Sequence, residues 1–191
     1  YLFAGTNKEA ATPHVAEVME GDPYSKVVES PAVLGYTPNQ ASVSIDIQSV
    51  TEPVTYYVQY SPAEVSYTVN HYKQNLDGSF PAEPTETEGL TGLTDSYVGD
   101  VAKDYTGFSN QLYEKPQIAA DGSTVVEIKY DRKYALINFD LDGGYGVEPI
   151  YDRYGAAVTV GTPTKAGYSF AGWSLDGTTI IALPSTVPAI L

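Results

Sequence analysis

The chain has 191 residues, with 24 Asp and Glu against 10 Lys and Arg, so its formal net charge is −14. This acidic balance repels phosphate backbones and anionic lipid surfaces, and we expect no nucleic-acid partner. Cysteine is absent, which excludes disulfides, thiolate nucleophiles and cysteine-based metal sites. The 17 Tyr and 17 Gly favour strands and turns over helices.

The first residue is Tyr1, without a basic leader after it, and no apolar stretch approaches the length of a membrane span. We therefore interpret the sequence as a segment of a longer protein and expect no membrane insertion within it. Residues 8–20 contain some helix-forming residues, but Pro13 interrupts them.

Two features follow in the first third of the chain. Residues 31–36 read Pro-Ala-Val-Leu-Gly-Tyr, a P-x-x-x-G-Y pattern in which Gly35 is best explained by a positive φ or a close approach of the backbone. Residues 54–60 alternate as a half-buried strand does. Every second residue from Val54 to Tyr60 is expected to point into the core. Tyr57 lies between these positions and is expected on the opposite, polar face.

The middle third opens with another alternating run. Val65, Tyr67, Val69 and His71 share its apolar parity, whereas Tyr72 falls on the polar one. Residues 88–105 are the best candidate for one short helix. A Gly-aromatic step follows at residues 105–108, and residues 124–130 again alternate as a strand.

The last third repeats the P-x-x-x-G-Y pattern at residues 163–168, where Gly167 matches Gly35. Asp-Gly pairs at residues 77–78, 121–122, 142–143 and 176–177 each adjoin strand-like sequence, which is typical of hairpin turns. The recurring Gly-aromatic steps divide the chain near residues 62 and 132. The sequence therefore predicts a mainly β (α+β) protein with modules at 1–62, 63–132 and 133–191.

Residues 134–144, followed by Pro-Thr-Lys-Ala-Gly-Tyr-Ser-Phe-Ala-Gly-Trp at 163–173, resemble the internalin-type B repeat (Listeria–Bacteroides repeat) family of bacterial surface proteins. The resemblance covers residues 133 to about 190. Such repeats finish with a further aromatic-rich strand, so we expect this module to be truncated at its C-terminal end. Within the resemblance Trp173 is a packing residue.

The first two modules resemble mucin-binding-protein (MucBP) modules. The similarity lies in residues 21–36 and the closing strand 54–60, and again in residues 66–72 with the turn 77–79 and residues 128–130. Both families are ubiquitin-like β-grasp folds that occur in tandem on cell-wall-anchored proteins. The resemblance thus implies three small β-grasp modules in an elongated arrangement on a Gram-positive cell surface.

No catalytic motif accompanies these features. The only histidines are His14, in a proline-containing loop, and His71, which is best interpreted as a strand residue. Asp140 and Asp142 beside Gly143 offer two carboxylates, but calcium sites need about six to eight oxygen ligands, so a turn is the better interpretation. We expect no enzyme activity, no cofactor and no metal.

Two exposed tyrosines are candidates for glycan contact. Tyr57 and Tyr72 both lie on polar strand faces, where a flat ring can stack on a sugar. The same positions also suit cross-strand packing, which we favour.

The predicted function is a non-catalytic, monomeric stalk or adhesin segment of an extracellular bacterial surface protein. It would project or present a binding region and contact host glycan, mucin or an extracellular protein. The alternative is a set of accessory modules in a large secreted glycosidase or protease whose catalytic domain lies outside this segment.

Overall fold

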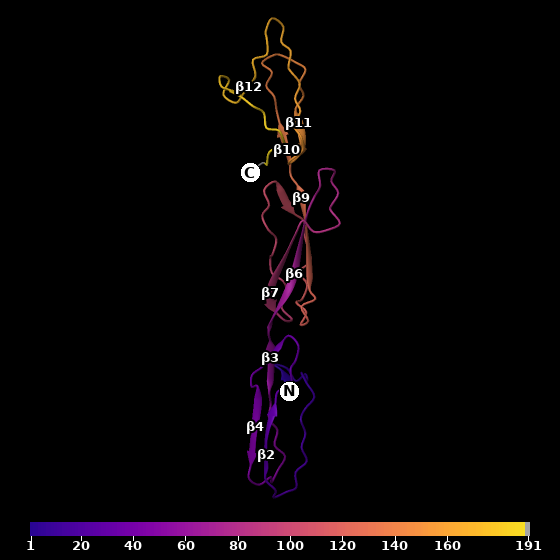
Figure 1. Cartoon of the computed structure of the whole chain (residues 1–191), viewed down its shortest axis with the longest axis vertical. Coiled ribbons are helices and arrows are strands. Elements are labelled where there is room, and N and C mark those ends of the chain that lie inside the picture. Colours follow the sequence, from indigo (N-terminus) through magenta and orange to yellow (C-terminus); the bar gives the residue numbers. More distant parts are fainter. Residues whose placement is uncertain (190–191) are drawn as a thin grey trace. The chain divides into compact units, whose positions relative to one another are not determined.

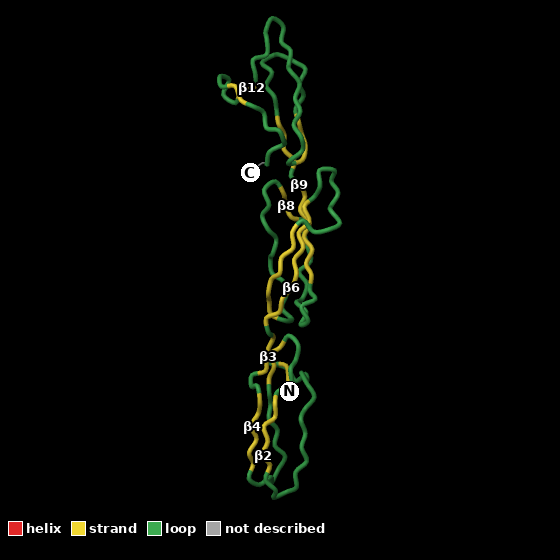
Figure 2. Tube along the Cα trace, in the orientation of Figure 1, coloured by secondary structure: helices red, strands yellow, loops and turns green. Residues whose placement is uncertain are grey.

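The structure is a computed structural model that describes residues 1–189. Throughout the described residues it contains strands, turns and loops but no helix, as Figure 2 shows. The mainly β prediction is therefore confirmed. The helix expected within residues 88–105 is wrong, because that stretch begins inside a strand whose burial alternates and which contains Gly89 and Gly92, both poor helix formers.

Thirteen strands are described, and most are labelled in Figure 1. They are β1 (Leu2–Phe3), β2 (Tyr24–Glu29), β3 (Tyr36–Pro38), β4 (Ser42–Ile47), β5 (Gln59–Pro62), β6 (Glu64–Lys73), β7 (Glu86–Leu93), β8 (Phe108–Asn110), β9 (Val125–Arg132), β10 (Tyr134–Ile137), β11 (Ile150–Arg153), β12 (Trp173–Ser174) and β13 (Ile180–Ile181). They form sheets in the orders β1-β5-β3, β2-β4, β7-β6-β9-β8, β10-β11 and β12-β13.

The longest strands contain the best-buried core. On β9 the side chains of Val126, Ile128 and Tyr130 are buried, and the residues between them are exposed. On β6 the predicted apolar parity is confirmed at Tyr67, Val69 and His71, all buried. Alternation in the sequence thus locates the core of this sheet correctly.

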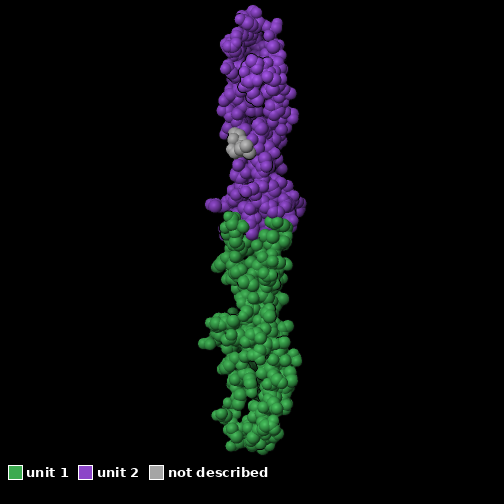
Figure 3. Space-filling view, turned by 90° about the vertical axis from the view of Figure 1, so that its left-hand side faces the viewer, with its two compact units in different colours: residues 1–68, 88–100, 115–125 green, residues 69–87, 101–114, 126–191 purple. Residues whose placement is uncertain are grey.

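Contacts divide the chain into two compact units, coloured separately in Figure 3. Unit 1 comprises residues 1–68, 88–100 and 115–125, and it contains the sheets β1-β5-β3 and β2-β4. Unit 2 comprises residues 69–87, 101–114 and 126–191, and it contains β10-β11 and β12-β13. The division into modules at residues 62 and 132 stays a prediction.

One hydrogen-bonded arrangement, here called the clasp, occurs three times. In each copy the third residue of a reverse turn has a positive φ and donates its amide to a distant carbonyl, and the distant residue donates its own amide back to the turn. The turns are residues 19–22, 93–96 and 153–156, and the distant residues are Val50, Ile118 and Val187. The paired bonds are 2.8 or 2.9 Å long in every copy.

The Gly-aromatic turn is a second element with three copies. The amides of Tyr36, Phe108 and Tyr168 each donate to the carbonyl three residues earlier, at 3.0 or 3.1 Å. Within these turns Gly35, Gly107 and Gly167 have φ values of 76°, 79° and 81°. The positive φ predicted for Gly35 and Gly167 is confirmed.

Each Asp-Gly pair also forms a turn between two consecutive strands that pair directly, namely β6 and β7, β8 and β9, β10 and β11, and β12 and β13, but none of these connections is only two residues long. In three of the pairs the aspartate accepts a hydrogen bond from the backbone amide two residues later, at 2.8 to 3.0 Å. The hydroxyls of Ser79 and Ser123, followed by the backbone amides of the same residues, lower the pKa of Asp77 and Asp121, and the amides of Thr179 and Thr178 lower the pKa of Asp176. These bonds stabilise local loops rather than tight two-residue hairpins.

Candidate functional site

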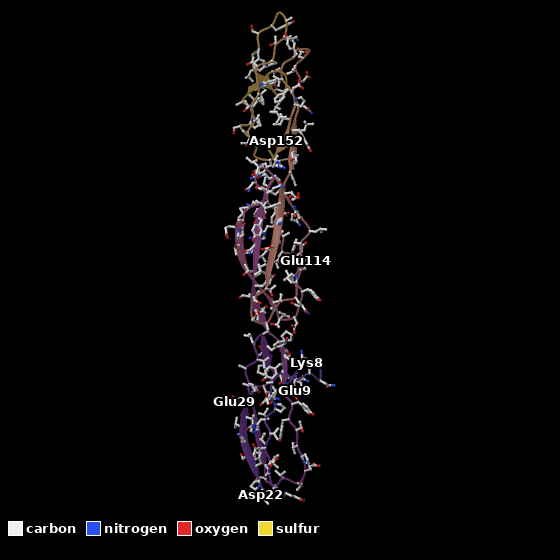
Figure 4. The ribbon with its side chains drawn as sticks, turned by 90° about the vertical axis from the view of Figure 1, so that its right-hand side faces the viewer. Lys8, Glu9, Asp22, Glu29, Glu114 and Asp152 are labelled. Carbon is white, nitrogen blue, oxygen red and sulfur yellow. The ribbon has the colours of Figure 1, made fainter. Side chains whose placement is uncertain are left out.

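Unit 1 contains a long apolar slot, here called the slot, with a volume of about 840 Å3. Its floor is the antiparallel pair β2-β4, and one of its walls is formed by residues 13–18 and the other by residues 50–58. Asp22 lies just before β2 and Glu29 ends it, so these two labels mark the length of the floor in Figure 4. The slot is within the range of volumes typical of ligand pockets.

The floor is apolar because the β2-β4 register gathers apolar residues on one face. Val28 pairs with Val43 and Tyr24 pairs with Ile47, so all four side chains point the same way, together with Ile45. The opposite face carries pairs such as Ser25 with Asp46. Only the apolar face lines the slot.

The slot is an unfinished core. Among residues 1–57 no side chain is fully buried, and the floor residues Val28, Val43, Ile45 and Ile47 are only half-buried. Acidic residues also line the slot, namely Glu17 and Glu52 in its walls and Glu9 and Glu20 outside them. The one histidine here, His14, lies 3.4 Å from the Tyr24 hydroxyl and 3.5 Å from Lys26 Nζ.

The wall at residues 50–58 corrects one prediction from the sequence. Val58 and Tyr60 are buried as predicted, but Val54 is 53% exposed and Tyr56 is 48% exposed. The alternation is real, and the prediction is wrong at its first two positions because nothing covers them. Tyr57, the first glycan candidate, lies on the same wall and is 63% exposed.

Tyr72, the second glycan candidate, lies on β6 in unit 2 and is half-buried. Its hydroxyl donates to Glu127 on β9 at 3.4 Å. Burial raises the pKa of Tyr72, and the Glu127 carboxylate raises it further. This contact is the cross-strand packing expected for such a position; glycan contact by Tyr57 and Tyr72 stays a prediction.

A buried polar cluster in unit 2 surrounds His71, which is a strand residue as predicted. His71 Nδ1 lies 2.8 Å from the Tyr130 hydroxyl, which also accepts the amide of Lys103 at 3.0 Å. Glu86 accepts hydrogen bonds from Lys103 Nζ and the Tyr105 hydroxyl, both at 2.6 Å. These two donors, Lys103 first, lower the pKa of Glu86 to about 2.

This cluster could not be predicted from the sequence, because its members are far apart along the chain. The only available signal was the position of His71, which alternates with apolar residues along its strand. A histidine buried at such a position requires a polar partner. The cluster fastens the segment 101–105 to the sheet through side-chain and backbone bonds. It holds that segment in place without leaving His71 or Tyr130 unsatisfied.

The two carboxylates considered as calcium ligands, those of Asp140 and Asp142, make contacts within the protein. Asp140 accepts the amide of Asp142 at 2.9 Å, and Asp142 pairs with Lys165 at 2.7 Å. The turn predicted here is confirmed. Within residues 1–189 no group of three or more His, Asp or Glu side chains is arranged to hold a metal ion.

Trp173 packs against other aromatic rings in unit 2. Its ring centroid lies 4.8 Å from that of Phe139 and 5.1 Å from that of Phe170. Its half-buried position agrees with the packing role predicted for it.

A single residue connects β5 to β6, and this link, the first joint, lies within unit 1. The amide of Ala63 donates to the Gly35 carbonyl at 2.8 Å, and the Ala63 carbonyl accepts the amide of Thr94 at 3.0 Å. The Tyr36 hydroxyl donates to Asp95, and this bond raises the pKa of Tyr36 to about 12. A side chain at Gly35 would collide with Ala120.

The link between β9 and β10, the second joint, lies within unit 2 and repeats this pattern. The amide of Lys133 donates to the Gly107 carbonyl at 2.9 Å, and the Lys133 carbonyl accepts the amide of Tyr154 at 2.8 Å. Arg132 donates to the Tyr154 carbonyl at 2.8 Å and stacks on Phe108. Each joint is therefore held on both sides of its single linking residue.

The comparisons with known proteins are sparse. No protein family profile matches the chain. A protein of Evansella cellulosilytica named "Putative membrane protein" is 24% identical over 142 residues, which cover 69% of this chain. The chain spans about a fifth, 20%, of the length of that relative. Within residues 1–189 the structure has no helix with the length and apolarity that crossing a membrane requires.

Proposed function

We propose that the chain is a non-catalytic segment of a bacterial cell-surface protein and serves as a spacer that presents a binding region. In this proposal residues 1–62, 63–132 and 133–191 are tandem β modules of the β-grasp kind. The sequence resemblance to MucBP modules and to the internalin B repeat supports this reading, as does the mainly β fold.

The pair of joints is the observation that carries the proposal. At Ala63 and at Lys133, one linking residue is bonded through its amide to a Gly-aromatic turn and through its carbonyl to the next clasp. A link of one residue with both backbone groups paired has little conformational freedom, unlike a flexible linker. Such links suit a spacer, whose purpose is to hold distance.

The relative from Evansella cellulosilytica supports a location at the cell envelope. Its name describes a membrane protein, and the chain matches a fifth of it, which leaves room for other domains in that protein. The net charge of −14 would keep an exposed array of sheets soluble and would discourage pairing between their edges.

The direct test is surface accessibility in the native host. Antibodies against residues 1–189 should label intact cells, and mild protease treatment of intact cells should release the segment while a cytoplasmic marker stays intact. Labelling that needs permeabilised cells would contradict the proposal. Recovery of the segment only from the medium, in one chain with a catalytic domain, would favour the secreted-enzyme alternative.

A glycan array tests whether the segment also binds. Binding that is lost in Tyr57→Ala or Tyr72→Ala, but kept in Tyr145→Ala, an exposed tyrosine elsewhere, would identify a lectin function. No binding to mucin or glycans by the intact segment would restrict its function to spacing.

A further inference from the structure

The slot has a filled counterpart within the same chain. Residues 36–62 and 108–132 carry the same strand pairing: Tyr36 pairs with Pro62 and Pro38 with Tyr60, while Phe108 pairs with Arg132 and Asn110 with Tyr130. Tyr60 therefore corresponds to Tyr130. Counting back along each strand, Tyr56 corresponds to Val126 and Val54 to Thr124.

The start of the chain corresponds to the end of β6. The amide of Ala4 donates to the Tyr60 carbonyl, and the amide of Gln74 donates in the same way to the Tyr130 carbonyl, both at 2.9 Å. Ala4 thus matches Gln74. Counting back, Tyr1 matches His71, and the carbonyls of both accept an amide from the chain that returns, that of Ala10 or of Thr85.

The match leaves seven residues of β6, Glu64 to Asn70, with no counterpart in residues 1–62. In the four-stranded sheet, β6 lies between β7 and β9. The counterpart of β7 is residues 11–18, and the counterpart of β9 is residues 55–62. Within these ranges, the stretches 13–18 and 55–58 form walls of the slot. Neither wall stretch is assigned to a strand, and both are drawn as loop in Figure 2.

The two copies of the strand differ in side-chain burial at the positions that the missing strand would cover. At the corresponding positions Thr124, Val126, Ile128 and Tyr130 are 8%, 1%, 0% and 1% exposed. Val54, Tyr56, Val58 and Tyr60 are 53%, 48%, 2% and 0% exposed. The two positions beside β1 are covered, and the two positions beyond it are open.

We propose that the slot is an acceptor site for one β-strand, supplied by the seven residues that continue β1 upstream of Tyr1 in the same polypeptide. Because β1 is parallel to β5, with Leu2 opposite Gln59, this strand runs parallel to residues 54–58. Its continuity with the existing β1-β5 pairing favours an occupant in cis. The proposal does not depend on where the protein is located in the cell.

The repeat also gives the chemistry of the strand. Val65, Tyr67 and Val69 on β6 lie six, four and two residues before His71, so the second, fourth and sixth residues before Tyr1 are apolar. These side chains contact the floor of β2-β4 and cover Val54 and Tyr56. Tyr57 stays exposed, as does Glu127, which has the same position on β9.

The test adds the strand. The extended protein carries Glu-Val-Ser-Tyr-Thr-Val-Asn, the sequence of residues 64–70, directly before Tyr1. We expect amide exchange of residues 13–18 and 54–58 to slow by about tenfold or more relative to the unextended chain, because these amides enter a paired sheet. Dye binding to exposed apolar surface should fall as well.

A matched control has the same extension followed by one inserted Ser before Tyr1. A slip of one residue turns every apolar side chain to the wrong face, so this control should gain no protection. Equal protection in both proteins, or none in either, would overturn the proposal. So would an unextended chain in which residues 54–58 are already strongly protected.

A second variant guards against an extension that aggregates. Ile45→Lys places a charge on the slot floor, and in the extended protein it should abolish the added protection while leaving exchange of residues 126–130 unchanged. The free heptapeptide added to the unextended chain tests supply in trans. Protection by the peptide at micromolar concentration, without protection by the fused extension, would overturn the occupant in cis.

Discussion

Residues 54–60 and 124–130 are two copies of one strand, and they differ in what lies beside them. Residues 124–130 lie beside β6 in the sheet over their whole length, and every second side chain among them is buried. In residues 54–60 only Val58 and Tyr60, which lie beside β1, are buried. Strand character therefore depends here on the neighbouring strand as much as on the residues of the strand itself.

The same contrast occurs at the Gly-aromatic turns. Gly107 lies against the ring of Tyr154 at the second joint, where a side chain would collide with that ring. Gly167 has nearly the same φ, but a side chain there would meet nothing within 4 Å. One backbone element thus serves both as a joint and as a free turn.

The largest effect should come from filling the packed glycine. Gly107→Val combines a strained positive φ with a collision against Tyr154, and we expect it to destabilise unit 2 by about 3 kcal/mol. The control Gly167→Ala has only the backbone strain and should cost about 1 kcal/mol. Urea unfolding followed by hydrogen exchange measures both. Equal costs would show that Tyr154 gives way and that the second joint is loose.

A smaller effect should separate the two copies of the strand. Val126→Ala removes a side chain that is 1% exposed and should cost about 2 kcal/mol. Tyr56→Ala truncates a larger side chain at the matching position, yet it should cost less than about 1 kcal/mol because that side chain is 48% exposed. The free energy of local opening, measured by hydrogen exchange, gives both values. A costly Tyr56→Ala would mean that the slot is closed in solution.

The third effect concerns the cluster around Glu86. This cluster occurs in the copy of the strand arrangement within residues 64–132 and has no equivalent in the copy within residues 1–62. Hydrogen bonds from Lys103 and Tyr105 hold the pKa of Glu86 at about 2, below its usual value of 4.5. Because the folded-state pKa is lowered, the stabilisation is fully present above about pH 4.5 and is lost as the pH falls towards 2. The urea midpoint of the native protein should therefore fall more steeply over this range than that of Glu86→Gln. Parallel pH profiles would contradict a stabilising role for the cluster.

The sequence predicts local geometry well and neighbours poorly. The positive φ of Gly35 and the buried parity of His71 follow from single residues and their spacing. The exposure of Tyr56 does not, because it is set by a strand that residues 1–62 do not contain. The Glu86–Lys103 pair was also out of reach, since 17 residues separate partners that the fold brings to 2.6 Å.

The smallest effect is expected at the exposed ion pair of Lys165 and Asp142. Its 2.7 Å separation matches the 2.6 Å of Lys103 and Glu86, but the Asp142 side chain is 95% exposed whereas that of Glu86 is 41% exposed. Water and salt screen the exposed pair, and ordering two free side chains offsets its attraction. Lys165→Met should therefore leave the urea midpoint unchanged, whereas Lys103→Met should lower it at pH 7 and at low salt. If both variants lowered it equally, hydrogen-bond length rather than the exposure of the pair would set the strength of these contacts.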